Sequence, residues 1–378
     1  MRLFLYKNMS FSYWEYKTWL SNVDFTIIGS GIVGLNCAIE LRKKFPKAKI
    51  LILEKGILPN GASTKNAGFA CFGSLSEILD DLHSHSEEEV LQLIQKRYNG
   101  LQLLRENLGD TVIDYQPNGG YELFTNEDHN LFETCLSKID DINHLLKPIF
   151  KGNVFATETN IFNFEKIQPA YIVNQFEGQI DTGNMMQALL HKAQKTGILI
   201  LNNCTVDAIE DLNERVEIKT EQFSFTTNKV LIATNGFASQ LGIEEVQPAR
   251  AQVLITKPIK NLHIKGTFHL DKGYYYFRNI NDRILFGGGR NLDFKTEETV
   301  VFGQTELVQQ TLEQILQETI LPNINFEIDH RWSGIMGVGN QKKSIVKPIS
   351  NNIFCGVRLG GMGVAIGSLV GKELADLL

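Results

Sequence analysis

Apolar positions near the start of the chain predict a strand, a helix and a second strand in close succession. Residues 24–29 (DFTIIG) form a short apolar run, and residues 32–44 place apolar side chains at helical spacing. Pro46 ends this helix, and residues 48–53 (AKILIL) form another apolar run. A strand, a helix and a strand in this order predict two parallel strands joined by a right-handed crossover.

The same rhythm returns later in the chain, between stretches of a different character. An apolar helix begins near residue 184 and ends at Gly197, a strand follows it, and residues 229–236 form another buried strand. A glycine-punctuated stretch over 57–73 lacks periodicity and is predicted to be a functional loop. The other predicted elements are helices over 75–108, 128–146 and 304–319, a strand at 120–125, a hairpin at 215–226, a strand-rich stretch over 251–290, and a strand, a glycine-rich turn and a helix at the C-terminus.

Composition narrows the class of protein. Of the 378 residues, 43% are hydrophobic and 21% are charged, which is typical of a folded globular protein and excludes a disordered chain. The length favours two domains. The net charge is −6 and Lys and Arg are scattered, so we expect a small-molecule partner and no nucleic acid.

Location can also be predicted from the pattern of apolar residues. The chain contains no run of 18 or more apolar residues, so we expect no membrane span. Residues 1–20 place aromatic and charged side chains where the cleavage site of a signal peptide would lie, so we expect a cytoplasmic protein.

Cysteine and histidine show no spacing that indicates a disulfide framework or a metal site. The five cysteines are far apart, and Cys37 lies in an apolar helical stretch, where it is predicted to pack as a small hydrophobic residue. Histidines such as His269 and His330 belong to no recognisable triad or metal cluster. We therefore expect no metal ion and interpret these histidines as structural.

The sharpest chemical signal is the G-x-G-x-x-G pattern at residues 29–34, between the first strand and the first helix. Gly29 permits a tight turn, Gly31 lets the backbone approach a pyrophosphate, and Gly34 lets the helix pack close to the strand. Glu54 ends the second strand, where a carboxylate can accept hydrogen bonds from a ribose diol. Together these features predict a dinucleotide-binding site, but the pattern alone serves both NAD and FAD.

Four segments distinguish between the two nucleotides. They are DFTIIGSGIVGLNCAIEL at 24–41 with Glu54, GASTKNAGF at 61–69, KVLIATNGFASQL at 229–241, and GVRLGGMGVAIGSLVGKELADLL at 356–378. In the order and spacing of these segments, from about residue 10 onward, the chain resembles the D-amino-acid oxidase (DAO) family of FAD-dependent oxidoreductases. Its pattern is most similar to the γ-glutamylputrescine oxidase-like and glycine oxidase-like branch. An NAD-dependent dehydrogenase would not account for the glycine-rich C-terminus.

The resemblance implies an FAD held without a covalent bond, because no cysteine or histidine falls clearly at a family attachment position. The residues implied for the ADP half are Gly29, Gly31, Ile32, Val33, Gly34, Glu54 and Lys55, with Val206 at the adenine. Those implied between the pyrophosphate and the flavin are Ser63, Thr64, Asn66, Ala67 and Gly68, and those closing the cleft are Thr234, Asn235 and Gly236. Those implied around the flavin ring are Arg358, Gly360, Gly361, Met362, Gly363 and Val364.

The residues on the substrate side depart from the family pattern. In members that act on α-amino acids, an arginine just after a W-x-G-like segment pairs with the substrate carboxylate, and this chain has Met336 there. Arg278 and Arg290 are two candidates to replace that arginine, and both could equally be surface charges. The departure favours the γ-glutamylputrescine oxidase-like branch over α-amino-acid oxidation.

Three consecutive tyrosines lie on a predicted strand, so that neighbouring rings point to opposite faces. The resemblance implies that the rings on one of the two faces meet the substrate above the flavin. These are either Tyr275 or the pair Tyr274 and Tyr276. Aromatic packing within the sheet is an equally good interpretation.

These features predict an FAD-dependent oxidoreductase that oxidises a C–N bond of a small amine or amino acid. Hydride would pass to flavin N5, and water would hydrolyse the imine. The electron acceptor would be O₂ or another carrier, and Leu285 lies near the position of a lysine that promotes O₂ reaction in sarcosine oxidase-like members. The alternatives are a dehydrogenase of a hydroxy acid or other small substrate that uses an acceptor other than O₂, and a non-catalytic flavin-binding protein.

The predicted fold class is α/β, with two interleaved domains. One is a Rossmann-like, glutathione-reductase-like FAD-binding domain formed by residues 24–75, 175–250 and 335–378. The other is a sheet-rich α+β substrate-binding domain formed by residues 76–174 and 251–334, and residues 1–23 are an N-terminal extension.

Overall fold

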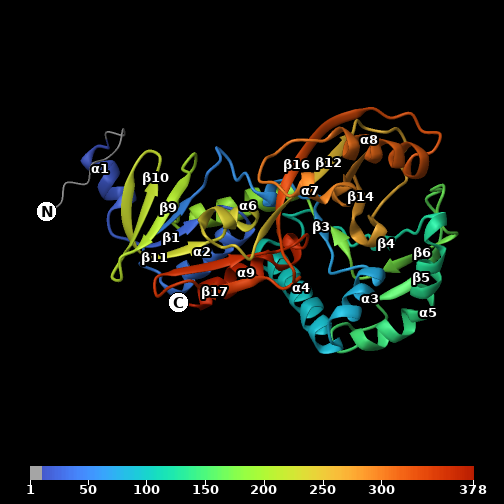
Figure 1. The fold of residues 1–378 in the computed structure, drawn as a ribbon, viewed down its shortest axis with the longest axis horizontal. Helices are drawn as coiled ribbons and strands as arrows, with labels where there is room; N and C mark the ends of the chain where they lie inside the picture. Colours follow the sequence, from blue (N-terminus) through green and yellow to red (C-terminus); the bar gives the residue numbers. More distant parts are fainter. Residues whose placement is uncertain (1–10) are drawn as a thin grey trace.

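The computed structural model describes residues 11–378, and these residues form two lobes, each built on its own large sheet (Figure 1). The first ten residues, part of the segment considered above for a signal peptide, lie outside the described residues. The C-terminus lies in the first lobe, so the chain returns to this lobe after forming the second.

The first lobe has a mainly parallel sheet with the strand order β17-β18-β11-β1-β2-β8, and β9 and β10 extend it beside β11. The predicted strand, helix and strand are confirmed, because β1 and β2 pair in parallel with α2 between them in the chain. The strands are β1 (Val23–Ile28), β2 (Ile50–Leu53), β8 (Leu199–Leu201), β9 (Val206–Asp211), β10 (Val216–Thr220), β11 (Ser224–Ile232), β17 (Ile345–Pro348) and β18 (Ile353–Val357). The helices are α1 (Tyr13–Glu15), α2 (Ile32–Lys44), α6 (Thr182–Lys195) and α9 (Gly363–Asp376).

Glycines bring the helices of this lobe close together. A Cβ atom added at Gly371 of α9 would lie 2.6 Å from the carbonyl oxygen of Val33 in α2, and one at Gly367 would lie 2.6 Å from the Ile32 side chain. The buried apolar side chains of α2, α6 and α9 cover one face of the sheet together with Ile27 and Ile52. This packing places the start of α2 against Gly367 and Gly371 of α9 and fixes the two helices relative to each other.

The second lobe has a mostly antiparallel sheet with the strand order β16-β12-β15-β14-β13-β4-β6-β5. The strands are β4 (Gly120–Glu122), β5 (Phe155–Thr159), β6 (Ala170–Asn174), β12 (Gln247–Thr256), β13 (Thr267–Leu270), β14 (Tyr275–Ile280), β15 (Arg283–Gly288) and β16 (Ile328–Val338). The helices are α3 (Leu75–Ser84), α4 (Glu87–Leu108), α5 (His129–Leu146), α7 (Phe294–Glu297) and α8 (Glu306–Ile315), and a small sheet pairs β3 (Phe69–Ala70) with β7 (Gly178–Gln179). One core packs α8 against the sheet, and a second packs α3, α4 and α5 against β5 and β6.

Three predicted elements differ from the observed ones. The helix predicted over 75–108 is two helices, because a capping box starts α4 at Ser86. The Ser86 hydroxyl accepts a hydrogen bond from the Glu89 amide, and the Glu89 carboxylate accepts one from the Ser86 amide. The second strand of the predicted hairpin and the strand predicted at 229–236 form one continuous strand, β11. The C-terminal region contains β16, β17 and β18 where a single strand was expected, because short apolar runs give little indication of how many strands they form.

The two lobes are also joined by close packing. A Cβ atom added at Gly100 of α4 would lie 2.2 Å from the carbonyl oxygen of Ala365 in α9. Helix α4 lies within the range predicted for the substrate-binding domain, yet it packs on the last helix of the first lobe. The division into domains stays a prediction.

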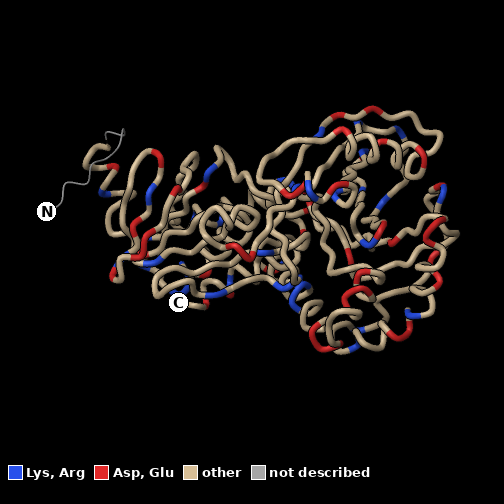
Figure 2. Tube along the Cα trace, viewed as in Figure 1, with Lys and Arg blue, Asp and Glu red and all other residues tan. Residues whose placement is uncertain are grey.

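Acidic and basic residues are mixed over both lobes, as Figure 2 shows. Within residues 11–378, no helix combines the length and the apolar character needed to cross a bilayer.

Candidate active site

A cavity of about 820 Å³ lies between the two lobes and is lined by residues of both sheets. Its volume is in the upper part of the range of about 300–1,000 Å³ that is typical of small-molecule sites. The first lobe contributes the β1–α2 turn, the end of β2, the start of β9 and the start of α9, whereas the second contributes β12, β14 and β16. The loop at 60–71 runs between them.

The turn between β1 and α2 depends on two close approaches of the backbone. Gly29 has a φ of +102°, and a Cβ atom there would lie 2.8 Å from the carbonyl oxygen of Ala233. A Cβ atom at Gly34 would lie 1.9 Å from the carbonyl oxygen of Gly29. Only glycine therefore lets α2 begin directly against the end of β1, which aims the helix N-terminus at the cavity.

The carboxylate of Glu54 is buried at the end of β2 and held in place from two sides. Its Oε2 accepts hydrogen bonds from the Ser30 amide at 3.0 Å and from the Ser30 hydroxyl at 2.7 Å. Its Oε1 accepts one from the Gly56 amide at 2.9 Å. Glu54 thus presents a fixed negative group to the cavity, next to the start of α2.

The start of α2 is in contact with the loop at 60–71. The Ser63 hydroxyl accepts a hydrogen bond from the Ile32 amide at 3.0 Å. A Cβ atom at Gly31 would lie 2.8 Å from this hydroxyl, so the space at the helix N-terminus is open only to small groups. The Ile32 amide, one of the free donors of a helix N-terminus, is thus already paired with Ser63.

The N-terminus of α9 forms the opposite wall. The amides of Gly363, Val364 and Ala365 donate to no acceptor in the part of the chain that the structure describes. A Cβ atom at Gly361 would meet no heavy atom within 4 Å, so the cavity is open in front of this helix end. These amides and the positive end of the helix dipole can stabilise a negative charge there.

The three consecutive tyrosines at the start of β14 lie on opposite faces of the second sheet. Tyr274 and Tyr276 line the cavity, whereas Tyr275 packs in the sheet core with Phe277 and Phe286. Burial raises the pKa of Tyr276 to about 12, so its hydroxyl is neutral at physiological pH. Of the two alternatives, the pair Tyr274 and Tyr276 lies on the cavity, because alternation along β14 turns the Tyr275 ring away from it. A role for these tyrosines at the substrate stays a prediction.

Of the two candidate arginines, only Arg290 lies on the cavity. Its guanidinium lies 5.5 Å from the ring centroid of Tyr274 and 5.1 Å from that of Phe294. Arg278 points to the same face of β14 as Tyr276 but is covered by Gly68, whose Cβ atom would lie 3.2 Å from the guanidinium carbon. Burial lowers the pKa of Arg278 to about 10. Arg278 therefore lies behind the loop at 60–71 and not on the cavity wall. A role for either arginine at the substrate stays a prediction.

Most residues predicted to bind the cofactor line the cavity, and four do not. Met336 also lines it, on β16. The four that lie behind its wall and shape it are Gly34, Thr64, Gly68 and Gly236. Thr64, for example, donates from its hydroxyl to the carbonyl of Pro59 at 2.8 Å, which holds the loop in its turn. These four are expected to act through backbone packing and not through contact.

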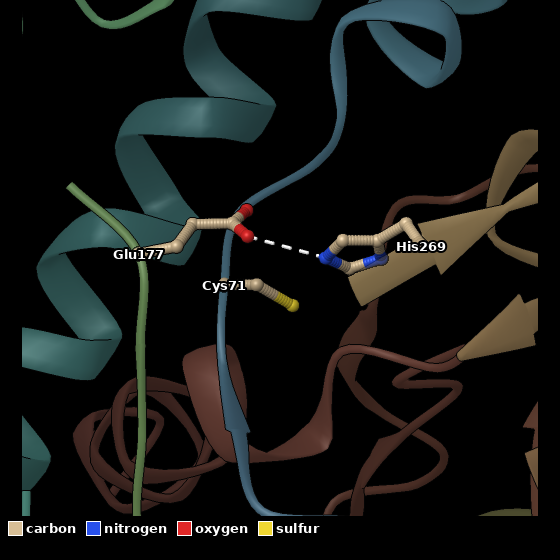
Figure 3. A group of neighbouring side chains, drawn as sticks. All are labelled: Cys71, Glu177 and His269. Atoms are coloured by element: carbon tan, nitrogen blue, oxygen red, sulfur yellow. Dashed lines mark hydrogen bonds and ion pairs between the residues drawn. The ribbon is translucent and has the colours of Figure 1, made fainter. Parts of the chain in front are cut away.

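Sequence reasoning did not reveal a buried group of three side chains, two of which, Cys71 and His269, line the cavity. Nε2–H of His269 on β13 donates a hydrogen bond to Oε2 of Glu177 at 3.2 Å, and Cys71 lies beside both (Figure 3). Their metal-ligand-type atoms all lie within 4.8 Å of one another. Burial and the charge of Glu177 raise the pKa of the Cys71 thiol well above its ordinary value. The three residues come from separate segments, so no local spacing could have indicated the group.

The fold and this cavity define a dinucleotide-binding oxidoreductase with a second, sheet-built wall. Residues 24–377 match the family described as FAD dependent oxidoreductase, DAO. The chain belongs to this family, as its motifs indicated, and FAD is its cofactor. The open space at Gly361, the unpaired amides of α9 and the Thr234 hydroxyl, which has no hydrogen-bond partner among the described residues, fit a large polar group of this kind.

Individual relatives are distant. The chain is 23% identical to the probable oxidoreductase OrdL of Haemophilus influenzae, over 96% of this chain and 84% of that protein. It is 21% identical to γ-glutamylputrescine oxidoreductase of Escherichia coli, over 94% and 83%. It is 24% identical to human dimethylglycine dehydrogenase over 79% of this chain, but it spans only 35% of that longer protein.

Solved structures share the fold. Glycine oxidase from Geobacillus kaustophilus superimposes with a TM-score of 0.76 at 20% identity, covering 94% of each chain. L-Proline dehydrogenase from P. horikoshii superimposes with a TM-score of 0.72 at 19% identity, covering 94% of this chain and 93% of that one. The predicted α/β fold class is confirmed.

Proposed function

We propose that this protein oxidises a C–N bond of a small amine or amino acid, with hydride passing to FAD held in the cavity between the lobes. The observation that carries the proposal is the composition of one continuous cavity. The wall formed by the first lobe contains glycines, helix N-termini and Glu54. The wall formed by the second lobe contains Tyr274, Tyr276 and Arg290. Several of the relatives described above are named for amine or amino-acid oxidation, which supports this class of substrate.

FAD, when bound, supplies the hydride acceptor. The cavity residues would hold the ADP half through the β1–α2 turn and Glu54, and the flavin end through residues 360–364 and the N-terminus of α9. Tyr274 and Tyr276 would cover the substrate and exclude bulk water. Leu285 is buried beside Ala67 and Val253, so this position carries no charge that could act on an electron acceptor.

The proposal is tested by mixing the FAD-loaded protein anaerobically with α-amino acids, N-alkylated amino acids, polyamines and 2-hydroxy acids, while flavin absorbance is followed. We expect at least one amine-containing class to bleach the flavin. Bleaching by hydroxy acids alone would favour the dehydrogenase alternative. No bleaching by any compound would favour a flavin-binding protein without catalysis.

Arg290 is proposed to bind an anionic group of the substrate. Two of the cavity's basic residues are neutralised by ion pairs, since Lys272 pairs with Asp80 at 3.0 Å and Lys342 pairs with Asp81 at 2.6 Å. Like Arg290, the cavity residues Lys55, Lys65, Arg97 and Arg358 have no ion pair among the described residues. Arg290 has no ion-pair partner within the described residues, and its guanidinium rests on aromatic rings. An arginine on a cavity wall without an acidic partner is suited to bind a carboxylate, the role that the family gives to an arginine at the position of Met336.

Replacement of Arg290 by glutamine is therefore expected to raise KM for a carboxylate-bearing amine by roughly 10- to 100-fold, since a charged hydrogen bond contributes about 1.5–3 kcal/mol. KM for an amine without a carboxylate should change much less. Steady-state kinetics on both substrates measures the difference. Arg283→Gln is the matched control. Arg283 begins β15, the strand that leads to Arg290, but it pairs with Asp329 and does not line the cavity. Equal losses for both substrates would contradict the assignment.

A further inference from the structure

Glu177 and His269 form a buried pair whose geometry is fixed by several contacts. Oε1 of Glu177 accepts a hydrogen bond from the Phe72 amide at 3.3 Å, while Oε2 meets Nε2 of His269 at 3.2 Å (Figure 3). A Cβ atom at Gly120 would lie 2.0 Å from Oε2, so only a glycine leaves room for this carboxylate. Glu177 and His269 are 1% and 5% exposed. Both side chains of the pair are therefore buried and held in a fixed position by the surrounding structure.

One side of His269 belongs to the wall that is expected to meet the substrate. Its ring lines the cavity and lies opposite Tyr276 in the register of β13 and β14. Phe69 contacts both rings, with centroids 5.2 Å from His269 and 5.7 Å from Tyr276. Nδ1 of His269 has no hydrogen-bond partner among residues 11–378. When the ring is neutral and Nε2–H donates to Glu177, Nδ1 is the nitrogen with a free lone pair.

The surroundings of His269 favour its protonated form. Burial alone would lower the pKa of His269, but the hydrogen bond and charge of Glu177, with smaller contributions from Glu77 and Glu122, raise it above its ordinary value. Glu122 lies beside His269 on β4 and accepts hydrogen bonds from Ser74 and Ser76.

The other ionisable neighbours of the pair are less suited than His269 to accept a proton from a molecule in the cavity. Cys71 carries a neutral thiol, because its pKa is raised well above the ordinary value. Tyr276 is neutral for the same reason. Arg97 on α4 lines the cavity and donates to the Phe72 carbonyl at 2.8 Å.

We propose that His269, positioned by Glu177, accepts the proton of the substrate ammonium before the C–H bond is broken. This inference rests on the proposed function and assigns a residue to one of its steps. An N–H bond of the ammonium breaks, its proton forms a bond to Nδ1, and the electron pair stays on the substrate nitrogen. The products of this step are a neutral amine and an imidazolium paired with the Glu177 carboxylate. His269 is thus a catalytic residue, and Glu177 is a positioning residue.

The test is the pH dependence of kcat/KM for flavin reduction in the FAD-loaded protein. In the wild type, kcat/KM should fall as the pH falls through the pKa of His269, because the protonated ring cannot accept the proton. Glu177→Gln removes the negative charge that raises the pKa of His269, so this pKa should fall and the acidic limb should move to lower pH. In His269→Gln, the limb should disappear and the plateau should fall by roughly 10²- to 10⁴-fold. His330→Gln, at an exposed position of β16, is the matched control and should keep the wild-type profile.

A second measurement does not depend on turnover. The imidazole C–H signals of the FAD-loaded protein, followed by NMR against pH, should include one signal that is absent in His269→Gln and titrates at lower pH in Glu177→Gln. An acidic limb that stays in place in Glu177→Gln, or that survives in His269→Gln, would overturn the inference while leaving amine oxidation intact. Failure of every amine to bleach the wild-type flavin would overturn the proposed function and this inference together.

Discussion

Replacement of Gly361 by valine is expected to give a folded protein that no longer retains FAD. A Cβ atom at this position meets nothing within 4 Å, and Gly361 does not have a positive φ, so the free protein accepts a side chain without strain. The same open space lies in the cavity directly before α9, where the family resemblance puts the flavin ring. Filling it should lower FAD affinity by about 100-fold or more, which is about 2.7 kcal/mol.

Two measurements check this outcome. Fluorescence titration of the apoprotein with FAD gives the dissociation constant, and thermal unfolding of the apoprotein shows whether the variant is folded. Gly183→Val is the matched control, since Gly183 lies in the first turn of α6 and does not line the cavity. Wild-type FAD affinity in Gly361→Val would show that the cofactor does not occupy this space.

Replacement of Gly34 by alanine is expected to damage the fold itself. The added Cβ atom would lie 1.9 Å from the carbonyl oxygen of Gly29 and 3.2 Å from the Ile27 side chain. The oxygen belongs to the backbone and cannot rotate away, so α2 would have to move off β1 and lose its packing on α9. We expect the free energy of unfolding to fall by about 3 kcal/mol or more, at the upper end of overpacking effects.

Urea unfolding of the apoprotein measures this change without a contribution from FAD binding. Gly183→Ala in α6 is the control and should change stability by less than about 1 kcal/mol, because it adds only a methyl group to an exposed helical position. If Gly34→Ala were as stable as the wild type, the contact between α2 and β1 would be looser than described.

The first nucleotide-binding unit could be predicted from sequence because its signals are local. An apolar run, the spaced glycines at 29–34 and Glu54 all lie within about 30 residues, and each has one dominant physical interpretation. The break between α3 and α4 was equally local, since Ser86 and Glu89 form a capping box that the sequence displays. Here the helical periodicity on both sides concealed the signal.

The substrate wall could be predicted only in part. Alternation showed that Tyr275 opposes Tyr274 and Tyr276, but which face is buried depends on the neighbouring strands. Gly287 of β15 decides it, because a Cβ atom there would lie 2.7 Å from the Tyr276 ring, and only glycine admits that ring. Arg278 shares the face of Tyr276 yet is covered by the loop at Gly68, a tertiary contact that no strand pattern reveals.

The pair formed by Glu177 and His269 could not have been found from sequence spacing. The two residues are 92 positions apart and meet only because β13 pairs in parallel with β4, whose Gly120 leaves space for the carboxylate. Single histidines are commonly structural, and only the register of the second sheet shows that this one lines the cavity.

The most direct test of the central claim is a crystal structure of the FAD-bound protein. We expect the diphosphate against the turn at residues 29–34 and a ribose hydroxyl donating to Glu54. The flavin ring should lie between the start of α9 and the wall formed by Tyr276, His269 and Arg290. A nucleotide bound elsewhere, or bound with its flavin ring turned away from the second sheet, would contradict it.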